Sequence, residues 1–329
     1  MKRIFTSIAL VLSALTGFSQ QEYQVSQNMF NQMPIFAGYA GINDAICGQL
    51  MYRNQWMGFN GNPKTLIFSV NAPWSSFGGP QNFGSGLSFS SDQLGFYSMT
   101  NIKLANAYHL PTVIANGKLG VGFDLSFSQQ SFTGTNGAGG TMSYIDNSDQ
   151  VLMGLGNTNG SALELGLGVF YKRQDLWFGI NTSQNLTSTI EWATASPQLA
   201  RHYYITAGYL MPLGSSRFEL EPSVFIKSDG SATQMDLAVR AIYDRQFWGG
   251  LAFRPVDAAV VMAGVTRQVG PGNLKIGFAY DYSMSSLRQD GTTTSGSNGS
   301  VELFLGYCMG ITPPPTTRKY YDPTLFDID

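Results

Sequence analysis

The sequence is poor in charge and has few of the side chains on which most enzymes rely. Asp, Glu, Lys and Arg make up 12% of its 329 residues, and it holds only 2 histidines and 2 cysteines. Soluble domains average about 25% charged residues. Beyond its first residues the chain lacks any apolar run of about 18 residues, which excludes a helix that spans a membrane. Its net charge of −2, without a basic cluster, argues against nucleic acid as a partner.

A chain with so little charge is poorly suited to stay soluble. Lipid admits only helices and closed β-barrels, because these structures alone satisfy every backbone hydrogen bond inside the chain. With spanning helices excluded, the composition indicates a β-barrel. The 38 glycines are spread along the chain, as expected where barrel strands pack closely or bend.

Catalytic and metal-binding patterns are missing as well. The two histidines, His109 and His202, belong to no nucleophile–base pattern, so a polar role at the rim or in the lumen is the better interpretation. No spacing of cysteine, histidine and acidic residues suits zinc, and no glycine-rich stretch lies between a strand and a helix as in a phosphate loop. We therefore expect no enzymatic activity, no catalytic residue, no cofactor and no metal.

Residues 1–19 have the pattern of a cleaved export signal. Two basic residues precede the apolar run 4–15, and 17–19 offers the small residues that a signal peptidase recognises. We expect cleavage before Gln20. A retained anchor is the alternative, but the run is shorter than the roughly 20 residues that a membrane helix needs.

Segment after segment alternates between apolar and polar residues with period two, which is typical of barrel strands. In 119–127 every second residue is apolar, and the residues between them are small or polar. One face suits lipid and the other suits a polar lumen. A soluble β-sandwich also alternates, but its solvent face normally carries more charge. The charged residues expected on the inner face are Asp124, Glu164, Lys172, Asp236, Arg240 and Glu302.

The alternation predicts an all-β fold, a transmembrane antiparallel β-barrel of about fourteen strands over residues 45–311. An even count is expected because both ends of a bacterial single-chain barrel return to the periplasm. The predicted strands are 45–56, 62–74, 84–92, 97–110, 117–131, 161–173, 175–185, 201–212, 216–228, 233–245, 246–255, 258–268, 273–284 and 299–311.

The lengths of the connections predict the orientation in the outer membrane. The longest ones, 132–160, 186–200 and 285–298, follow the fifth, seventh and thirteenth predicted strands. All three therefore lie at the same end, and outer-membrane barrels place long loops outside and short turns in the periplasm. Aromatic residues near strand ends are expected in the interfacial girdles, with core packing as the alternative: Trp56, Phe59, Trp74, Phe77, Tyr108, Trp177, Trp192, Tyr203 and Trp248.

Two segments lie outside the predicted wall. Residues 20–44 either cross the periplasmic mouth or form a partial plug in the lumen, since apolar residues such as Met29, Phe30 and Ile35 disfavour a solvated leader. Residues 312–329 begin with three prolines, which favour an extended periplasmic tail. Its apolar residues predict a peptide that binds a periplasmic partner, with a disordered tail as the alternative: Tyr320, Tyr321, Leu325, Phe326 and Ile328.

The two cysteines stand on the first and last predicted strands, which are neighbours in a closed barrel. Cys47 shares its face with Gln49 and Arg53, and Cys308 shares its face with Glu302, so both are expected in the lumen. Disulfides persist in exported proteins. We predict a Cys47–Cys308 disulfide across the seam, with free thiols after a register slip as the alternative.

Several stretches of the chain together form a specific pattern. They include Ser-Gln-Asn-Met-Phe-Asn at 26–31 and Ala-Gly-Tyr-Ala-Gly at 37–41. The most specific part is the end of the first strand and the hairpin after it: Tyr52, Arg53, Asn54, Gln55, Trp56, Gly58, Phe59, Gly61, Pro63 and Thr65. In these stretches the chain resembles the PorP/SprF family, outer-membrane components of the type IX secretion system of the Bacteroidetes.

This resemblance implies a role in protein export across the outer membrane, and in some members gliding motility or anchoring of adhesins. The implied partners are outer-membrane lipid, periplasmic ring lipoproteins, the translocon and secreted proteins. A small-solute porin or transporter is the alternative, because the inner charges would either line a channel or close it through salt bridges.

Overall fold

A computed structural model describes residues 22–58, 60–80, 82–111, 117–133, 158–191, 198–285 and 297–311. The short helices are α2 (Gln32–Ile35), η1 (Ala37–Tyr39) and η2 (Trp74–Phe77). The strands are β1 (Ala45–Asn54), β2 (Lys64–Pro73), β3 (Phe83–Leu94), β4 (Tyr97–Pro111), β5 (Lys118–Phe132), β6 (Thr158–Lys172), β7 (Leu176–Ser183), β8 (His202–Tyr209), β9 (Met211–Pro212), β10 (Phe218–Ser228), β11 (Thr233–Tyr243), β12 (Phe247–Arg254), β13 (Ala258–Val269), β14 (Gly272–Ser283) and β15 (Ser300–Gly310).

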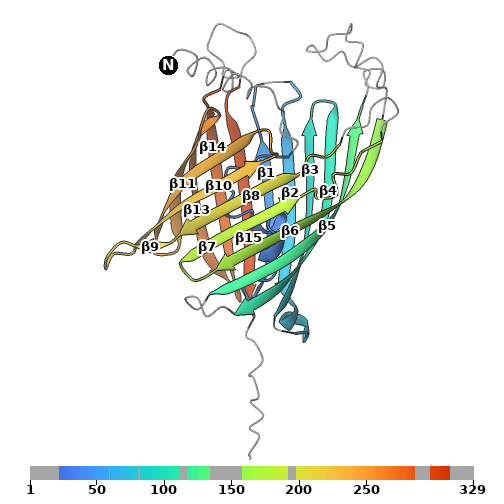
Figure 1. Ribbon diagram of the computed structural model, residues 1–329. Coiled ribbons are helices and arrows are strands. Elements are labelled where there is room, and N and C mark those ends of the chain that lie inside the picture. The colour runs from blue at the N-terminus through green and yellow to red at the C-terminus, as the bar shows by residue number, and fades with distance from the viewer. Residues whose placement is uncertain are drawn as a thin grey trace, which may run out of the picture.

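The strands form one closed antiparallel barrel (Figure 1). β15 pairs with β1, and β10 pairs with β11, so the sheet has no free edge. β8 and the two-residue β9 pair in succession with β10, so they are one strand interrupted at Leu210. The wall therefore has fourteen strands. The predicted fold is confirmed, and the strand boundaries differ from the predicted ones by at most three residues.

Alternation in the sequence becomes two chemically different faces of the wall. On β5, Val121, Phe123 and Leu125 are 45%, 45% and 52% exposed, whereas Asp124 and Ser126, which alternate with them, are buried. Pleating causes this pattern, because successive side chains leave a strand on opposite sides. The outer face is an apolar surface far larger than soluble monomers expose, as lipid contact requires.

The long connections all leave one end of the barrel. They follow β5, β7 and β14, and we call this the long-loop end. Turns such as 173–175 and 244–246 lie at the opposite, short-turn end, where β1 begins and β15 finishes. The expected signal peptide and the tail residues Tyr320 to Ile328 lie outside the described residues.

The expected aromatic girdles are only partly correct. Trp74, Phe77, Tyr108 and Tyr203 are exposed near strand ends. Trp248, however, is buried in the lumen and packs edge-on against Phe30 at 5.1 Å between ring centroids. Trp177 likewise faces inward, against the buried cluster that contains Phe36. Both tryptophans stand at inward positions of their strands, and the segment that precedes β1 gives them an apolar partner there. Phe59 and Trp192 lie outside the described residues.

Residues 22–44, which we call the luminal segment, run through the inside of the barrel (Figure 1). Near its start, the Gln24 side chain donates to Asp257, in the β12–β13 turn at the long-loop end, over 3.1 Å. At its other end the Asp44 carbonyl accepts from the Ile311 backbone N–H at the short-turn end, over 3.1 Å. The segment thus crosses the lumen from one end to the other.

Candidate functional site in the lumen

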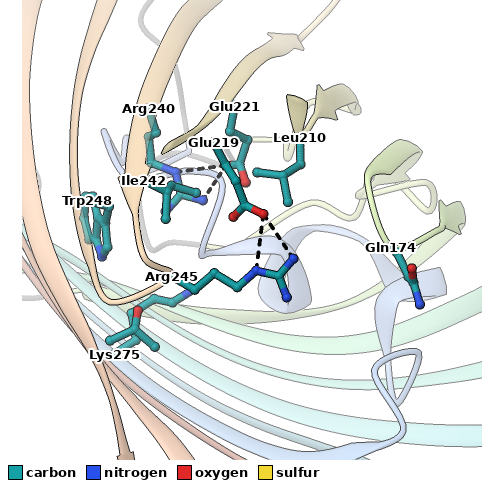
Figure 2. A pocket seen from close by; sticks show the side chains of 10 residues that line it. Gln174, Leu210, Glu219, Glu221, Arg240, Ile242, Arg245, Trp248 and Lys275 are labelled. Atoms are coloured by element: carbon teal, nitrogen blue, oxygen red, sulfur yellow. Dashed lines mark hydrogen bonds and ion pairs between the residues drawn. The ribbon is translucent and has the colours of Figure 1, made fainter. Parts of the chain in front are cut away.

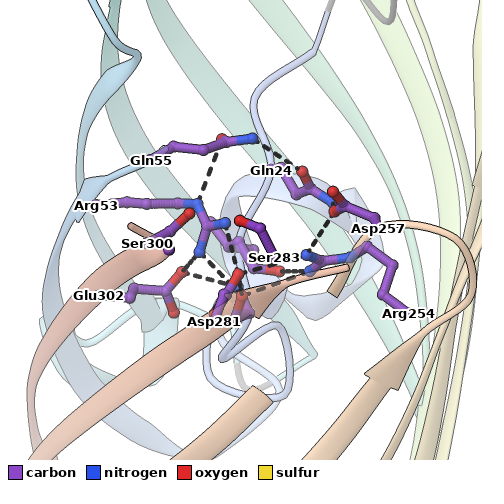
Figure 3. Close-up of polar contacts among 12 residues, drawn as sticks. Gln24, Arg53, Gln55, Arg254, Asp257, Asp281, Ser283, Ser300 and Glu302 are labelled. Carbon is purple, nitrogen blue, oxygen red and sulfur yellow. Dashed lines mark hydrogen bonds and ion pairs between the residues drawn. The ribbon is translucent and has the colours of Figure 1, made fainter. Parts of the chain in front are cut away.

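Five charged side chains on five wall strands meet beneath the long-loop end and form what we call the luminal network: Arg53, Asp236, Arg254, Asp281 and Glu302. Arg53 contacts Asp281 at 2.7 Å and Glu302 at 3.2 Å. Arg254 contacts Asp236 at 2.8 Å and Asp281 at 3.5 Å. Figure 3 shows the two guanidinium groups converging on Asp281 from opposite sides. All five side chains are buried, which is stable only because they are paired.

The luminal network also holds the luminal segment. The hydroxyl of Ser26 donates to Asp281 over 2.7 Å and accepts from Arg53 over 2.9 Å. The backbone N–H groups of Ser26 and Gln27 both donate to the Glu302 carboxylate, each over 2.7 Å. Hydrogen bonds to ionised groups are about twice as strong as neutral ones. Residues 26–27 are therefore bound to the wall by charge-assisted bonds in a site shielded from water.

Aromatic packing fixes the middle of the luminal segment. Phe30 stacks on Phe304 with 4.8 Å between ring centroids, and the Arg240 guanidinium lies 4.6 Å from the Phe30 centroid. Arg240 is itself paired with Glu221. A cation held over an aromatic face contributes about 0.5–2 kcal/mol. A small-solute channel was the alternative because inner charges could line it. Of those charges, Arg240 and Glu302 contact the luminal segment, and Asp124 pairs with Lys103.

Close backbone contact fixes the lower part of the luminal segment. Gly38 lies directly against Gly120 on β5: a Cβ added at Gly120 would stand 2.0 Å from the Gly38 carbonyl oxygen. Phe36 packs against Phe170 with 5.6 Å between ring centroids. His109 Nε2 donates to the Ala40 carbonyl over 2.9 Å, so this histidine is buried and serves the segment. Only glycine permits so close an approach of the two backbones.

Replacing Gly120 by valine is expected to destabilise the protein. The new side chain would collide with the Gly38 carbonyl, and overpacking of this kind costs about 1–3 kcal/mol. Gly48→Val is the matched control, because a Cβ at Gly48 meets nothing within 4 Å and valine suits a strand. Urea titration in detergent should show a lower midpoint for the first variant only. Equal midpoints would mean that the segment does not press against β5.

Below Phe30 the lumen keeps a cavity of about 550 Å³ that reaches the turns of the short-turn end. We call it the short-turn cavity. Lys172, Trp177, Arg240 and Lys275 line it from the barrel wall, and Phe30 of the luminal segment bounds it toward the long-loop end. Figure 2 shows Arg240 and Arg245 aimed at Glu221 and Glu219 beside this space. At the rim, hydrogen bonding from the Arg173 guanidinium lowers the pKa of Asp175.

The predicted motif residues lie mainly where the first strand meets the luminal segment. Arg53 is central to the luminal network, and Gln55 accepts from its Nε over 3.5 Å and donates to Gln24 over 3.3 Å. The Thr65 hydroxyl donates to Asp92 over 2.5 Å. Phe59 lies outside the described residues. Sequence reasoning missed Arg254 and Asp281, although both lie at inward positions of their strands and inward parity was the signal that would have found them.

Cys47 and Cys308 are direct partners in the β1–β15 ladder, and a disulfide joins them across the seam, with 4.1 Å between their Cα atoms. Both residues line the short-turn cavity. The bond connects residues 261 positions apart in the sequence. It therefore covalently closes the wall at the pair of strands that are farthest apart along the chain.

Replacing both cysteines by serine should lower the free energy of unfolding by roughly 2–5 kcal/mol, since a long loop in the unfolded chain is released. The measurement is urea unfolding in detergent with and without reductant. Reductant should shift the parent protein to the midpoint of the variant and leave the variant unchanged. Mass spectrometry that found two alkylated thiols in the unreduced parent would contradict the prediction.

The second histidine has an equally local role. His202 Nδ1 lies 3.0 Å from the Gln184 side-chain oxygen and 2.9 Å from the Ala200 carbonyl.

Within the described ranges no group of three or more His, Cys, Asp and Glu side chains is placed to hold a metal ion. No helix there has the length and apolar character to cross a membrane.

Two solved structures illustrate the likeness in the course of the chain. A Pseudomonas aeruginosa FadL homologue is 12% identical, with 84% of this chain and 94% of that one covered and a TM-score of 0.46. The Pseudomonas putida toluene transporter TodX is 10% identical, with 91% and 97% covered and a TM-score of 0.46. At such identities and scores, what those proteins carry has no bearing on this chain.

Comparison with curated proteins gives no match. The model of one protein family does match, and it covers residues 17–307, nearly the whole chain. That span includes the luminal segment and every strand of the barrel up to Tyr307 on β15. The family is described as "Type IX secretion system membrane protein PorP/SprF". The chain belongs to this family of type IX secretion membrane proteins.

Proposed function

We propose that this protein is a non-enzymatic outer-membrane component of type IX secretion whose barrel is plugged by its own luminal segment. The observation that carries the proposal is the binding of residues 26–27 to the buried luminal network. A channel for small solutes needs a continuous water-filled path, whereas the segment crosses the lumen from Gln24 to Asp44. Family membership supports the link to protein export.

On this proposal the protein acts by assembling with other components. Residues 312–329, which continue from β15 at the short-turn end, would contact periplasmic ring lipoproteins or the translocon through Tyr320, Tyr321 and Phe326. Apolar and aromatic residues in an extended segment are suited to such contacts. Secreted proteins are further candidate partners. A role in gliding motility or in anchoring adhesins would depend on whether the exported proteins serve those processes.

The test is deletion of the gene followed by measurement of type IX substrates in the medium and at the cell surface. Export should fail in the deletion strain and return with the parent gene. Purified protein in planar bilayers should in parallel give no steady single-channel current. Normal export in the deletion strain, together with a steady current from the purified protein, would support a small-solute porin instead.

A further inference from the structure

The short-turn cavity carries more positive than negative charge. Three of its arginines are paired with acids: Arg173 with Asp175, Arg240 with Glu221, and Arg245 with Glu219. The two remaining cations, Lys172 and Lys275, form no ion pair within the described part of the chain. Lys275 lies with its Nζ 4.5 Å from the centroid of Phe30, and Lys172 donates to Asn43.

Hydrogen-bond donors at this cavity also lack partners. Gln49 Nε2 and Trp177 Nε1 are buried and have no partner among the described residues, and both residues line the cavity. Trp248 Nε1 is likewise buried without a partner among the described residues, and Trp248 lines a neighbouring pocket that shares Arg240 and Lys275 with this cavity. A buried donor without an acceptor costs about 1–3 kcal/mol. Two lysines without an acidic partner, beside aromatic rings, favour a ligand that is negatively charged and partly aromatic.

A segment of this chemistry leaves the barrel at the rim of the same cavity. Ile311 follows β15 and its N–H is bonded to the Asp44 carbonyl at the short-turn end. The last ten residues, 320–329, hold three aspartates and no lysine or arginine, together with Tyr320, Tyr321 and Phe326. An extended chain spans about 3.3 Å per residue, so residues 312–325 provide more than enough length for Phe326 to reach the cavity.

We propose that the acidic, aromatic half of the tail, residues 320–329, binds in the short-turn cavity of its own barrel. A cavity of about 550 Å³ has the size of a small-ligand site, so it holds one aromatic ring and the carboxylate beside it rather than the whole tail. Phe326 with Asp327 fits that description. The aspartate carboxylate would face Lys275, and the ring would join Phe30 and Trp177. A partner that binds the tail would then have to draw it out of the cavity.

The experiment places the photo-crosslinking residue p-benzoylphenylalanine at Phe326 of the full chain in native outer membranes and maps the products by mass spectrometry. Intramolecular links to residues 172–177 and 273–275 are expected. Lys275→Gln should lower their yield about threefold or more, and so should high salt, because both remove charge attraction. Arg217→Gln, a cation at the same end but outside the cavity, should leave the yield unchanged.

Links only to other proteins, or no links, would overturn the inference, as would a yield that is the same in the Lys275 and Arg217 variants. Lys172→Gln and a second probe position at Tyr321 keep the test valid if one variant fails to fold. The inference rests on the proposed function only in placing the short-turn end in the periplasm. If export requires the protein and no intramolecular link forms, the proposed function stands and the inference alone fails.

Discussion

Replacing Arg53 by methionine is expected to lower the free energy of unfolding by about 3–5 kcal/mol. The change keeps the volume of the side chain but leaves Asp281 and Glu302 buried without their nearest cation. It also removes the donor to the Ser26 hydroxyl, so the luminal segment loses one of its bonds to the wall. Urea unfolding in detergent, followed by tryptophan fluorescence, measures the effect.

Arg245→Met is the matched control. Arg245 also forms an ion pair, 3.1 Å from Glu219, but its side chain is 81% exposed, and exposed pairs contribute about 0–1 kcal/mol. Adding Glu302→Gln to Arg53→Met should recover part of the loss, because one uncompensated buried charge is removed. A loss of the same size in both arginine variants would show that the luminal network is no more important than a surface pair.

Deleting residues 22–35 is expected to make the barrel conduct ions, whereas the parent protein is expected to give no steady current. The fourteen wall strands pair with one another rather than with the luminal segment, so the barrel is expected to persist. Its lumen would then lose the side chains that fill it, and barrels of somewhat more strands leave aqueous channels. Planar-bilayer recording should show steady currents, roughly tenfold or more above those of the parent protein.

A synthetic peptide with the sequence of residues 22–44 provides the control for this deletion. Added to the bilayer chamber, it should reduce the current, because Ser26 and Gln27 can again bind Asp281 and Glu302. A scrambled peptide of the same composition should not. The proposal of a plugged lumen fails if the deleted protein folds, by its heat-modifiable gel mobility, and still conducts no more than the parent.

The sequence predicted the wall well because its pattern repeats along every strand. Period-two alternation marks which residue faces lipid, and the pleat of a strand turns that pattern directly into two faces. The largest error in a boundary is at β6, which begins at Thr158 rather than at 161. Alternation is weak over those residues, and it is pairing with Gln130 to Phe132 of β5 that extends the strand.

The candidate site could be predicted only in part. Arg53 and Glu302 were placed on the inner face by parity, and Cys47 and Cys308 by their places on the first and last strands. Nothing in the local sequence pairs Arg53 with Asp281, or Arg254 with Asp236, because these residues are brought together only when the barrel closes. Trp248 shows the same limit: it has the position of a girdle residue and the environment of a core residue.

By itself the sequence determined that this chain forms a barrel, how many strands it has and which end carries the long loops. Those properties depend on local alternation and on the lengths of connections. Tertiary structure alone decided that residues 22–44 run through the lumen and that inner charges such as Asp281 and Glu302 bind the segment. The physical reason is that a buried charge is stable only beside its partner. Here the partners lie far apart along the chain, as Ser26 and Glu302 do.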